Sequence, residues 1–319
     1  MKCIVTGGAG FIGSSLVKKL LNLNWDVDVV DDLSGGRFCS LEGTDIKPAH
    51  PKGATGYKNF FVCDFADPLI LKRISENFYD IVFHQAAIPR VSYSVENPAE
   101  TNLVNVSKTV ELLEACCDRV RRFIFASSSS VYGGAETLPI EVTFSKNPKS
   151  PYALQKSITE EYCRLFSTLY DLDTVCLRYF NVFGPGQYGD SPYATAVSSW
   201  CHSISKKLPI RSDGDGTQSR DLCYIDNVVS ANILAATSSK KFLGDVYNVC
   251  CGDQISNREI LDYLRERYLN LEIVNAPWRA GDVMHTRGDI SKTRQDLGYE
   301  PTIKFWEGLE RTLEWWNLI

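Results

Sequence analysis

The alternation of short apolar runs with longer amphipathic stretches constrains the fold of this 319-residue chain more than any other feature. Runs rich in Val, Ile and Phe are typical of buried strands, and the stretches between them place apolar residues at helical spacing. This alternation predicts strand–helix–strand units, which build a parallel sheet covered by helices. Strands are predicted at 2–6, 26–30, 59–62, 81–84, 122–126 and 174–179, and helices at 11–23, 69–77, 99–116 and 153–170.

The alternation ends near residue 180, which predicts two domains. Beyond RYFNVFGPGQYG (178–189), loops rich in Gly, Pro, Ser and Asp surround shorter elements. We expect an α/β fold, with a doubly wound parallel sheet in a cofactor-binding domain at 1–180 and a smaller C-terminal α/β substrate-binding domain at 181–319. The run DVYNV (245–249) predicts a return to the sheet within 221–250, and the polar stretch 43–58 predicts an exposed loop.

Composition and charge exclude several classes of protein. The formal net charge is −5, which gives no basic surface for a phosphate backbone, so we expect no nucleic-acid partner. The start MKCIVTGG has too few apolar residues for a signal peptide, and no apolar run approaches the ~18–20 residues of a membrane span. The 11 cysteines form no C-x-x-C or His-spaced cluster. We therefore expect a soluble cytoplasmic protein with reduced core cysteines and no metal site.

A glycine-rich turn indicates a dinucleotide site. In CIVTGGAGFIG, Gly7, Gly10 and Gly13 follow a strand and open a helix, where the backbone can approach a pyrophosphate and the helix N-terminus offers free N–H groups. The next strand ends at Asp31, whose carboxylate can accept from both adenosine ribose hydroxyls and would repel a 2′-phosphate. These features predict a Rossmann-like domain that binds NAD. Asp64, after the following strand, fits either the adenine edge or the cap of the next helix.

The segment SPYALQKS (150–157) holds a candidate acid–base pair, Tyr152 and Lys156. Residues four apart share a helix face, and an ammonium near a phenol favours the phenolate, lowering a pKa of about 10 toward neutrality. Such a phenolate can act as a general base. By itself the pair also fits two surface residues. The serines at 127–130 end a predicted strand and can offer a hydroxyl to the same substrate oxygen.

Taken together, these motifs resemble the extended short-chain dehydrogenase/reductase family over nearly the whole chain. The resemblance implies that Tyr152 is the base, Ser128 its hydroxyl partner with assistance from Ser129, and Lys156 the tuner and a ligand of the nicotinamide ribose. It also implies a cofactor cleft formed by Gly7, Gly10, Phe11, Ile12, Gly13, Asp31, Asp32, Asp64, Phe65, Gln85, Ala86, Ala87, Asn102, Tyr152, Lys156 and Tyr179.

Three later segments resemble UDP-sugar 4-epimerases, especially the UDP-N-acetylglucosamine type. They are RYFNVFGP, GDGTQSRDLCYIDN and WRAGDVMHTRGDISK. Read without the family, their arginines fit surface charges, whereas the resemblance assigns them to a diphosphate, which suits the planar guanidinium fork. It implies Asn181, Arg220 and Arg279 on the diphosphate and Asp282 on the uridine ribose. The other implied substrate residues are Arg90, Ser128, Ala194, Val197, Trp200, Arg211 and Thr286.

The positions after Ser128 bear on the reaction. Related 4,6-dehydratases and decarboxylases resemble the chain but carry an acidic residue where Ser129 and Ser130 stand, and serine cannot replace a carboxylate acid or base. Epimerisation needs neither: Tyr152 takes the proton of the 4-hydroxyl as a hydride passes to NAD, and the 4-keto sugar turns and takes the hydride back on its other face. A non-catalytic NAD-binding sensor is the alternative from another class. Retention of Ser128, Tyr152 and Lys156 disfavours it.

By resemblance, three positions bear on the choice of substrate. Thr286 stands at the family's gate beside the sugar, where a small residue admits an N-acetyl group. This implies UDP-GlcNAc/UDP-GalNAc, with UDP-Glc/UDP-Gal also accepted. Arg90 stands where a small residue is usual, and Arg211 where an aromatic is common. If Arg90 faces the sugar it can pair with a carboxylate, as in UDP-glucuronate 4-epimerases; otherwise it points to solvent or reaches the diphosphate.

The family pairs its subunits through two helices from each. The resemblance therefore implies a homodimer formed by 99–116 and 153–170.

Overall fold

The structure is a computed structural model that describes residues 1–48, 59–76, 78–190, 194–278 and 283–319. The chain forms two compact units that interleave along the sequence. The sequence-based boundary at residue 180, with a return within 221–250, stays a prediction of the functional domains. Unit 1 is Met1–Ser128, Ser150–Arg178 and Val229–Tyr247, and unit 2 is Ser129–Lys149, Tyr179–Val228 and Asn248–Ile319.

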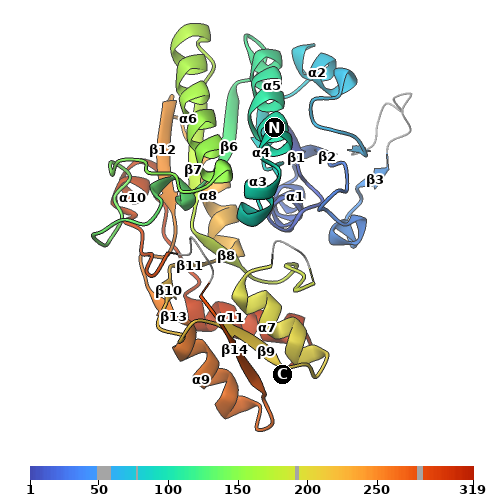
Figure 1. Ribbon diagram of the computed structural model, residues 1–319. Coiled ribbons are helices and arrows are strands. Elements are labelled where there is room, and N and C mark those ends of the chain that lie inside the picture. Colours follow the sequence, from blue (N-terminus) through green and yellow to red (C-terminus); the bar gives the residue numbers. More distant parts are fainter. Residues whose placement is uncertain (49–58, 77, 191–193, 279–282) are drawn as a thin grey trace. The chain divides into compact units, whose positions relative to one another are not determined.

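Unit 1 is built on an eight-stranded sheet of order β12-β7-β6-β5-β1-β2-β4-β3 (Figure 1). The pairs β1–β2, β1–β5, β2–β4, β3–β4 and β5–β6 are parallel. The order reverses between β1 and β5, and in such sheets ligands bind at the carboxyl ends of the strands beside this reversal. The strands are β1 Lys2–Thr6, β2 Asp26–Val30, β3 Lys47–Pro48, β4 Asn59–Phe61, β5 Ile81–His84, β6 Arg122–Ser128, β7 Thr174–Tyr179 and β12 Leu243–Val249.

This sheet confirms the predicted α/β, Rossmann-like class. Each predicted strand is present, and β12 confirms the predicted return of 245–249 to the sheet, next to β7. The predicted loop 43–58 contains the two-residue strand β3, and its residues 49–58 lie outside the described part of the chain. Strands of a parallel sheet are buried on both faces, which explains why their apolar runs were readable in the sequence.

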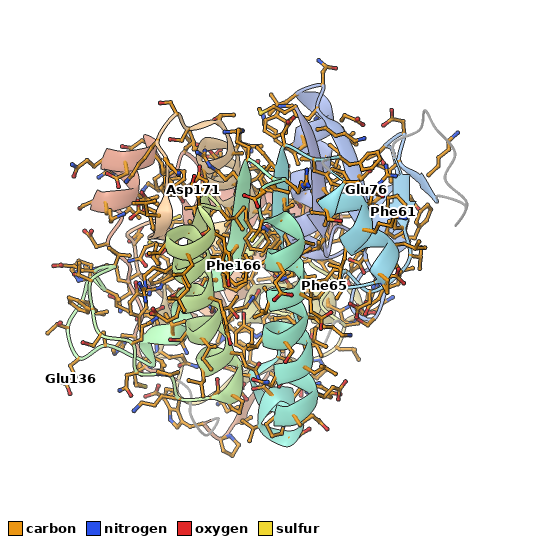
Figure 2. All side chains as sticks on the ribbon, turned by 90° about the horizontal axis from the view of Figure 1, so that it is seen from above. Phe61, Phe65, Glu76, Glu136, Phe166 and Asp171 are labelled. Atoms are coloured by element: carbon orange, nitrogen blue, oxygen red, sulfur yellow. The ribbon has the colours of Figure 1, made fainter. Side chains whose placement is uncertain are left out.

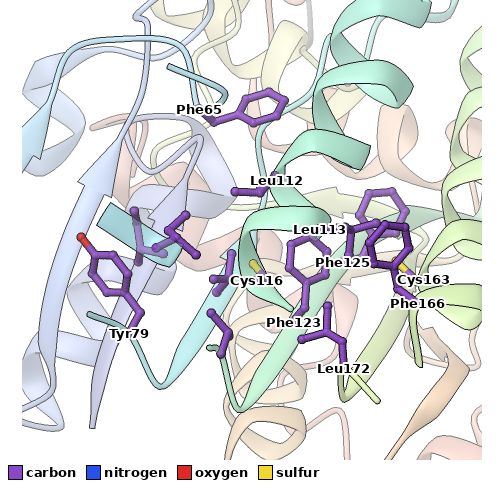
Figure 3. Close-up of a cluster of buried hydrophobic side chains, with 14 of the residues drawn as sticks. Phe65, Tyr79, Leu112, Leu113, Cys116, Phe123, Phe125, Cys163, Phe166 and Leu172 are labelled. Carbon is purple, nitrogen blue, oxygen red and sulfur yellow. The ribbon is translucent and has the colours of Figure 1, made fainter. Parts of the chain in front are cut away.

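Helices α2, α5 and α6 bury one face of the sheet. Their apolar residues pack with Phe123 and Phe125 of β6, as Figure 3 shows for Leu112, Leu113 and Phe166. Helix α6 runs beside α4 and α5 (Figures 1 and 2). The helices of this unit are α1 Phe11–Asn22, α2 Pro68–Ser75, α3 Val91–Glu96, α4 Pro98–Asn102, α5 Lys108–Cys116 and α6 Pro151–Tyr170, with α8 Ile225–Thr237 belonging to both units.

Two helical segments differ from the prediction. The helix expected over 99–116 is interrupted by a π-helical turn at Leu103–Ser107, between α4 and α5. Such turns insert an extra residue into a helix and occur frequently at functional sites. The short helix α3 was not predicted, because its six residues between Pro89 and Pro98 are too few to show a period.

Unit 2 is built from small two-stranded sheets and peripheral helices. β8 (Asn181–Phe183) pairs with β11 (Leu222–Tyr224) in parallel, as does β9 (Ile210–Asp213) with β14 (Ile273–Ala276). β10 (Ser219–Arg220) and β13 (Ile255–Ser256) are antiparallel. Within the described ranges, none of the helices is both long and apolar enough to cross a bilayer. The remaining elements of unit 2 are α7 Ala196–Ser205, α9 Asn257–Arg267, α10 Ser291–Leu297, α11 Phe305–Trp315 and the short turn η3 Ser129–Tyr132, whereas the short turn η1 Phe38–Leu41 belongs to unit 1.

Candidate active site

The glycine-rich turn joins β1 to α1 at the carboxyl end of the sheet. Gly7 has φ of +67°, and a Cβ there would lie 2.7 Å from the backbone nitrogen of Ala86. A Cβ on Gly13 would lie 2.0 Å from the carbonyl oxygen of Gly7. Gly10 is the N-cap of α1, with no side chain to cap it. The turn therefore needs glycine to form, and the first N–H groups of α1 have the geometry that binds a pyrophosphate.

Asp31 ties the loop after β2 to this turn. It is 7% exposed, and its Oδ2 accepts from Ala9 N–H at 2.9 Å while Oδ1 accepts from Leu33 N–H at 2.8 Å. Burial raises the pKa of the carboxyl, and these backbone donors oppose that shift. Since a carboxylate offers about four acceptor sites, Asp31 retains capacity for ribose hydroxyls. The neighbouring Asp32 is exposed and accepts from Ser34.

Asp64 is engaged in an ion pair. Its Oδ1 accepts from Ala66 N–H at 2.8 Å, and its Oδ2 lies 2.5 Å from Lys108 Nζ. The alternative that Asp64 caps the next helix is wrong, because Asp67 is the N-cap of α2 and accepts from Leu69 N–H. Contact of Asp64 with adenine stays a prediction. Phe65 is buried with its ring edge against His84.

The loop after β5 contains the predicted cleft residues Gln85, Ala86 and Ala87, all half-buried. The predicted Asn102 is exposed at the end of α4, whereas Asn105, in the π-helical turn, is buried. The Asn105 amide accepts from Ile88 N–H at 2.8 Å and donates to Ile88 O at 3.1 Å. Asn105 thus holds this loop in place. An asparagine flanked by Val104 and Val106 within a predicted helix was the signal that sequence reasoning missed.

The predicted catalytic residues of unit 1 come together at the start of α6. The side chain of Ser128, at the end of β6, hydrogen-bonds with Tyr152. Lys156 is 3% exposed, and its Nζ lies 5.9 Å from the centre of the Tyr152 ring and donates to Ala126 O at 2.8 Å. The Tyr152 N–H donates to Ser94 Oγ of α3 at 3.1 Å. The buried phenol of Tyr152 therefore has the hydroxyl of the half-buried Ser128 and the buried ammonium of Lys156 as neighbours.

The expected lowering of the Tyr152 pKa is wrong for the chain by itself. Burial raises the pKa of Tyr152 to about 12, and the hydrogen bond from Ser128 opposes this only in part. Burial also lowers the pKa of Lys156 to about 8. The ammonium of Lys156 points at a carbonyl and the face of Phe125, so it stabilises the phenolate less than the spacing suggested. Ionisation of Tyr152 requires further positive charge at the site.

Arg90 lies just before α3 and is exposed. Its Nε donates to Ser92 Oγ at 3.0 Å. In unit 1 by itself, Arg90 is therefore held by a local contact.

Unit 2 brings several of the predicted substrate residues together. Thr286 N–H donates to Ser219 O at 3.1 Å, and Thr286 Oγ1 accepts from Asp221 N–H at 3.2 Å, so the predicted gate lies beside Arg220. Arg220 Nη1 donates to the carbonyls of Ser219 and Met284, each at 3.0 Å. Asn181 pairs with Leu222 in the β8–β11 ladder, two residues from Arg220.

A second group gathers around α7. The buried Trp200 donates from Nε1 to Arg211 O at 2.9 Å, and the exposed Arg211 guanidinium pairs with Asp213 at 2.8 Å. Val197 is buried on the same helix, and Ala194 is half-buried before it.

The other predicted site residues lie elsewhere in the chain. Tyr179 is buried at the end of β7, and Ser129 is half-buried at the start of η3. Arg279 and Asp282 lie outside the described residues.

Asp221 is a residue of this region that sequence reasoning missed. It is fully buried, and its carboxylate accepts from the N–H groups of Cys251 at 2.8 Å, Gly252 at 3.0 Å and Gly288 at 3.1 Å. Burial raises the pKa of Asp221 to about 6. A carboxylate inside the apolar run DLCYI, next to Arg220, was the available signal.

No cluster that could hold a metal ion occurs among the described residues, taking groups of three His, Cys, Asp or Glu side chains.

Comparison with known proteins identifies the family of the chain. A family described as "NAD dependent epimerase/dehydratase family" matches residues 3–250. A putative UDP-glucose 4-epimerase of Methanocaldococcus jannaschii is 33% identical over 98% of this chain and 97% of its own.

Two solved structures are similar along the whole chain. One is UDP-N-acetylglucosamine 4-epimerase from Methanobrevibacter ruminantium in complex with UDP-N-acetylmuramic acid, with TM-score 0.89 and 33% identity over 99% of this chain and 98% of that one. The other is UDP-glucuronic acid 4-epimerase from Bacillus cereus in complex with UDP-glucuronic acid and NAD, with TM-score 0.87 and 30% identity over 99% of each chain.

Proposed function

The chain belongs to the NAD dependent epimerase/dehydratase family, and we propose that it is a UDP-sugar 4-epimerase acting on UDP-GlcNAc/UDP-GalNAc and on UDP-Glc/UDP-Gal. The observation that carries the proposal is the hydrogen bond of the half-buried Ser128 with the buried Tyr152, whose ring centre lies 5.9 Å from Lys156 Nζ. The cofactor is NAD: the glycine turn, the open N-terminus of α1 and the carboxylate of Asp31 fit a dinucleotide with a free 2′-hydroxyl.

Each residue has a defined task in this reaction. Tyr152 takes the proton of the sugar 4-hydroxyl and later returns it, and Ser128 holds the same oxygen by a hydrogen bond. Lys156 stays protonated near neutral pH, since its pKa is about 8, and favours the phenolate. Bound NAD supplies a hydride acceptor and donor and, when oxidised, a positive charge that offsets the raised pKa of Tyr152.

Several observations support epimerisation over elimination and one sugar class over another. Ser129 and Ser130 follow Ser128, so these positions supply no carboxylate for dehydration. Thr286 supports acetylated substrates by its size at the proposed gate. The alternative substrate is UDP-glucuronate, for which Arg90 would supply the cation; its contact with Ser92 opposes this role in unit 1 by itself.

The test is an assay panel with no added NAD. Purified protein is incubated with UDP-GlcNAc, UDP-Glc and UDP-glucuronate in turn, and the products are separated from their C4 epimers by anion-exchange chromatography. Interconversion of the first two pairs is expected. Loss of water with a 4-keto product would indicate a dehydratase, and turnover of UDP-glucuronate only would replace the proposed substrate.

A variant tests the assigned base. Tyr152→Phe should retain NAD and lose about 10²–10⁴-fold in turnover, because the phenolic proton acceptor is gone. Tyr170→Phe, at the exposed end of the same helix, is the matched control and should leave turnover unchanged. Near-normal rates in Tyr152→Phe would reject the assignment.

We also propose a homodimer formed through α4, α5 and α6. Helix α6 exposes Leu154, Leu165 and Leu169, with Leu169 66% exposed, and Leu103 before α5 is 50% exposed. An apolar row along an otherwise amphipathic helix favours burial against a second copy. Sedimentation of the wild type should give a dimer, and Leu165→Glu/Leu169→Glu a monomer; a wild-type monomer would contradict the proposal.

A further inference from the structure

A buried ion pair lies one helical turn beyond Lys156. Glu160 of α6 is 2% exposed and Arg178 of β7 is 4% exposed. Arg178 Nε lies 2.8 Å from Glu160 Oε1, and Arg178 Nη2 lies 2.8 Å from Oε2, so the pair is bidentate. Ser127 Oγ donates to the same Oε1 at 2.6 Å. One carboxylate thus joins α6, β6 and β7.

The ion pair supports the strand end that carries the catalytic hydroxyl. Ser127 precedes Ser128 in β6, and the carbonyl of Ala126 accepts from Lys156 Nζ at 2.8 Å. Consecutive residues of β6 are therefore held by side chains from successive turns of α6. Loss of the Glu160 carboxylate would free Ser127 from its contact with α6, so the end of β6 could move relative to Tyr152 and Lys156.

We propose that Glu160 is a positioning residue of the reaction, whose carboxylate locks the end of β6 to α6 and thereby keeps Ser128 and Lys156 in place beside Tyr152. The inference rests on the proposed function. Glu160 lies one turn too far along α6 to be the base, and it acts through Ser127 and Lys156.

The charges around Lys156 give Glu160 a second effect. Burial has the largest effect and lowers the pKa of Lys156, whereas Cys163, Cys176 and Glu160, in this order, raise it. The thiol of Cys176 is neutral at ordinary pH, because its hydrogen bond with Cys163 and its burial raise its pKa well above the usual value. Among the groups that raise the pKa of Lys156, Glu160 is the carboxylate, and its negative charge favours the ammonium. The titratable and charged groups near Lys156 are His84 of β5, Tyr152, Glu160 and Cys163 of α6, and Cys176 and Arg178 of β7.

The chain offers a matched control at the opposite end of the same strands. Arg122, which begins β6, donates from Nε and Nη2 to Asp173 Oδ2 at 2.9 and 2.7 Å. This pair is also buried and joins β6 to the start of β7, but it lies at the amino-terminal edge of the sheet, away from Lys156. Asp173→Asn breaks an equivalent pair without touching the site.

The experiment compares the holoenzymes of Glu160→Gln and Asp173→Asn by the pH profile of kcat/KM. We expect Glu160→Gln to lose about 10²-fold in kcat. The alkaline limb of its pH profile should move down by about one pH unit or more, since the variant removes a negative charge near Lys156 and keeps the positive charge of Arg178. Asp173→Asn should lose stability and keep the wild-type profile. Glu160→Gln/Arg178→Gln removes both charges of the ion pair, so it serves if the single variant does not fold. The alkaline limb of its pH profile should lie between those of the wild type and Glu160→Gln.

A readout independent of activity separates this inference from the proposed function. NMR titration of protein with labelled lysine, with Lys156→Met for assignment, reports the Lys156 pKa directly. That pKa should fall in Glu160→Gln and stay unchanged in Asp173→Asn. Equal pH profiles and equal Lys156 titrations in these variants would overturn the role of Glu160. Absence of epimerisation by the wild type would instead overturn the proposed function.

Discussion

Adding one methyl group at two glycines of the nucleotide turn should give opposite results. A Cβ on Gly13 would lie 2.0 Å from the Gly7 carbonyl oxygen and 2.8 Å from Gly8 Cα, both backbone atoms that cannot rotate away. A Cβ on Gly10 would meet nothing closer than 3.2 Å. Since ordinary contacts begin near 3.4 Å, Gly13→Ala must push α1 from the turn by more than 1 Å, whereas Gly10→Ala needs a few tenths of an ångström.

The expected magnitudes follow from these distances. Gly13→Ala should lower the free energy of unfolding by about 3 kcal/mol, the upper part of the range for overpacking. Gly10→Ala should change it by less than about 0.5 kcal/mol, yet its methyl stands where the pyrophosphate approaches the backbone, so NAD binding should be lost. Urea unfolding of nucleotide-free protein and titration calorimetry with NAD measure both quantities. Equal losses of stability in the two variants would refute the reasoning.

Three further predictions concern single positions. Thr286→Tyr should reduce kcat/KM for UDP-GlcNAc relative to UDP-Glc by at least about tenfold, measured with each sugar separately; equal losses would reject the gate. Lys108→Met should raise the dissociation constant of NAD by up to about fivefold, because Asp64 loses the partner of its partly exposed ion pair. Calorimetry measures the dissociation constant, and an unchanged value would contradict a role of Asp64 at the adenine. Burial raises the pKa of Asp221 to about 6, so its stabilising contribution is complete below about pH 4 and is lost as the pH rises through 6. The free energy of unfolding should fall by about 3 kcal/mol over this window, and urea unfolding of Asp221→Asn should lack this component.

Sequence reasoning succeeded where one physical rule decides the outcome. Strands buried on both faces must be apolar throughout, so β1, β2, β5 and β7 were predicted with the bounds that they have. The glycine turn was predictable from a different rule, since the backbone at Gly7 and Gly13 leaves no space for a Cβ.

It failed where the outcome depends on contacts across the chain. The buried amide of Asn105 lies in the π-helical turn and hydrogen-bonds with Ile88, a contact between distant positions that no local period records. Contact of the exposed Asn102 with the cofactor stays a prediction. The spacing of Tyr152 and Lys156 correctly placed both on one helix, but burial decides the direction of their pKa shifts, and burial is a property of the folded chain.

The late arrival of β12 in the sequence has a consequence for synthesis. Strand β7 is complete at residue 179, but its neighbour β12 spans Leu243–Val249. During translation, the edge of β7 that pairs with β12 therefore lacks its partner strand until more than sixty further residues have been synthesised. An exposed strand edge of this kind can pair with strands of other nascent chains and so promote aggregation. Truncation of a gene at residue 180 would make that hazard permanent, so an isolated nucleotide-binding half should aggregate unless it carries 229–247 as well.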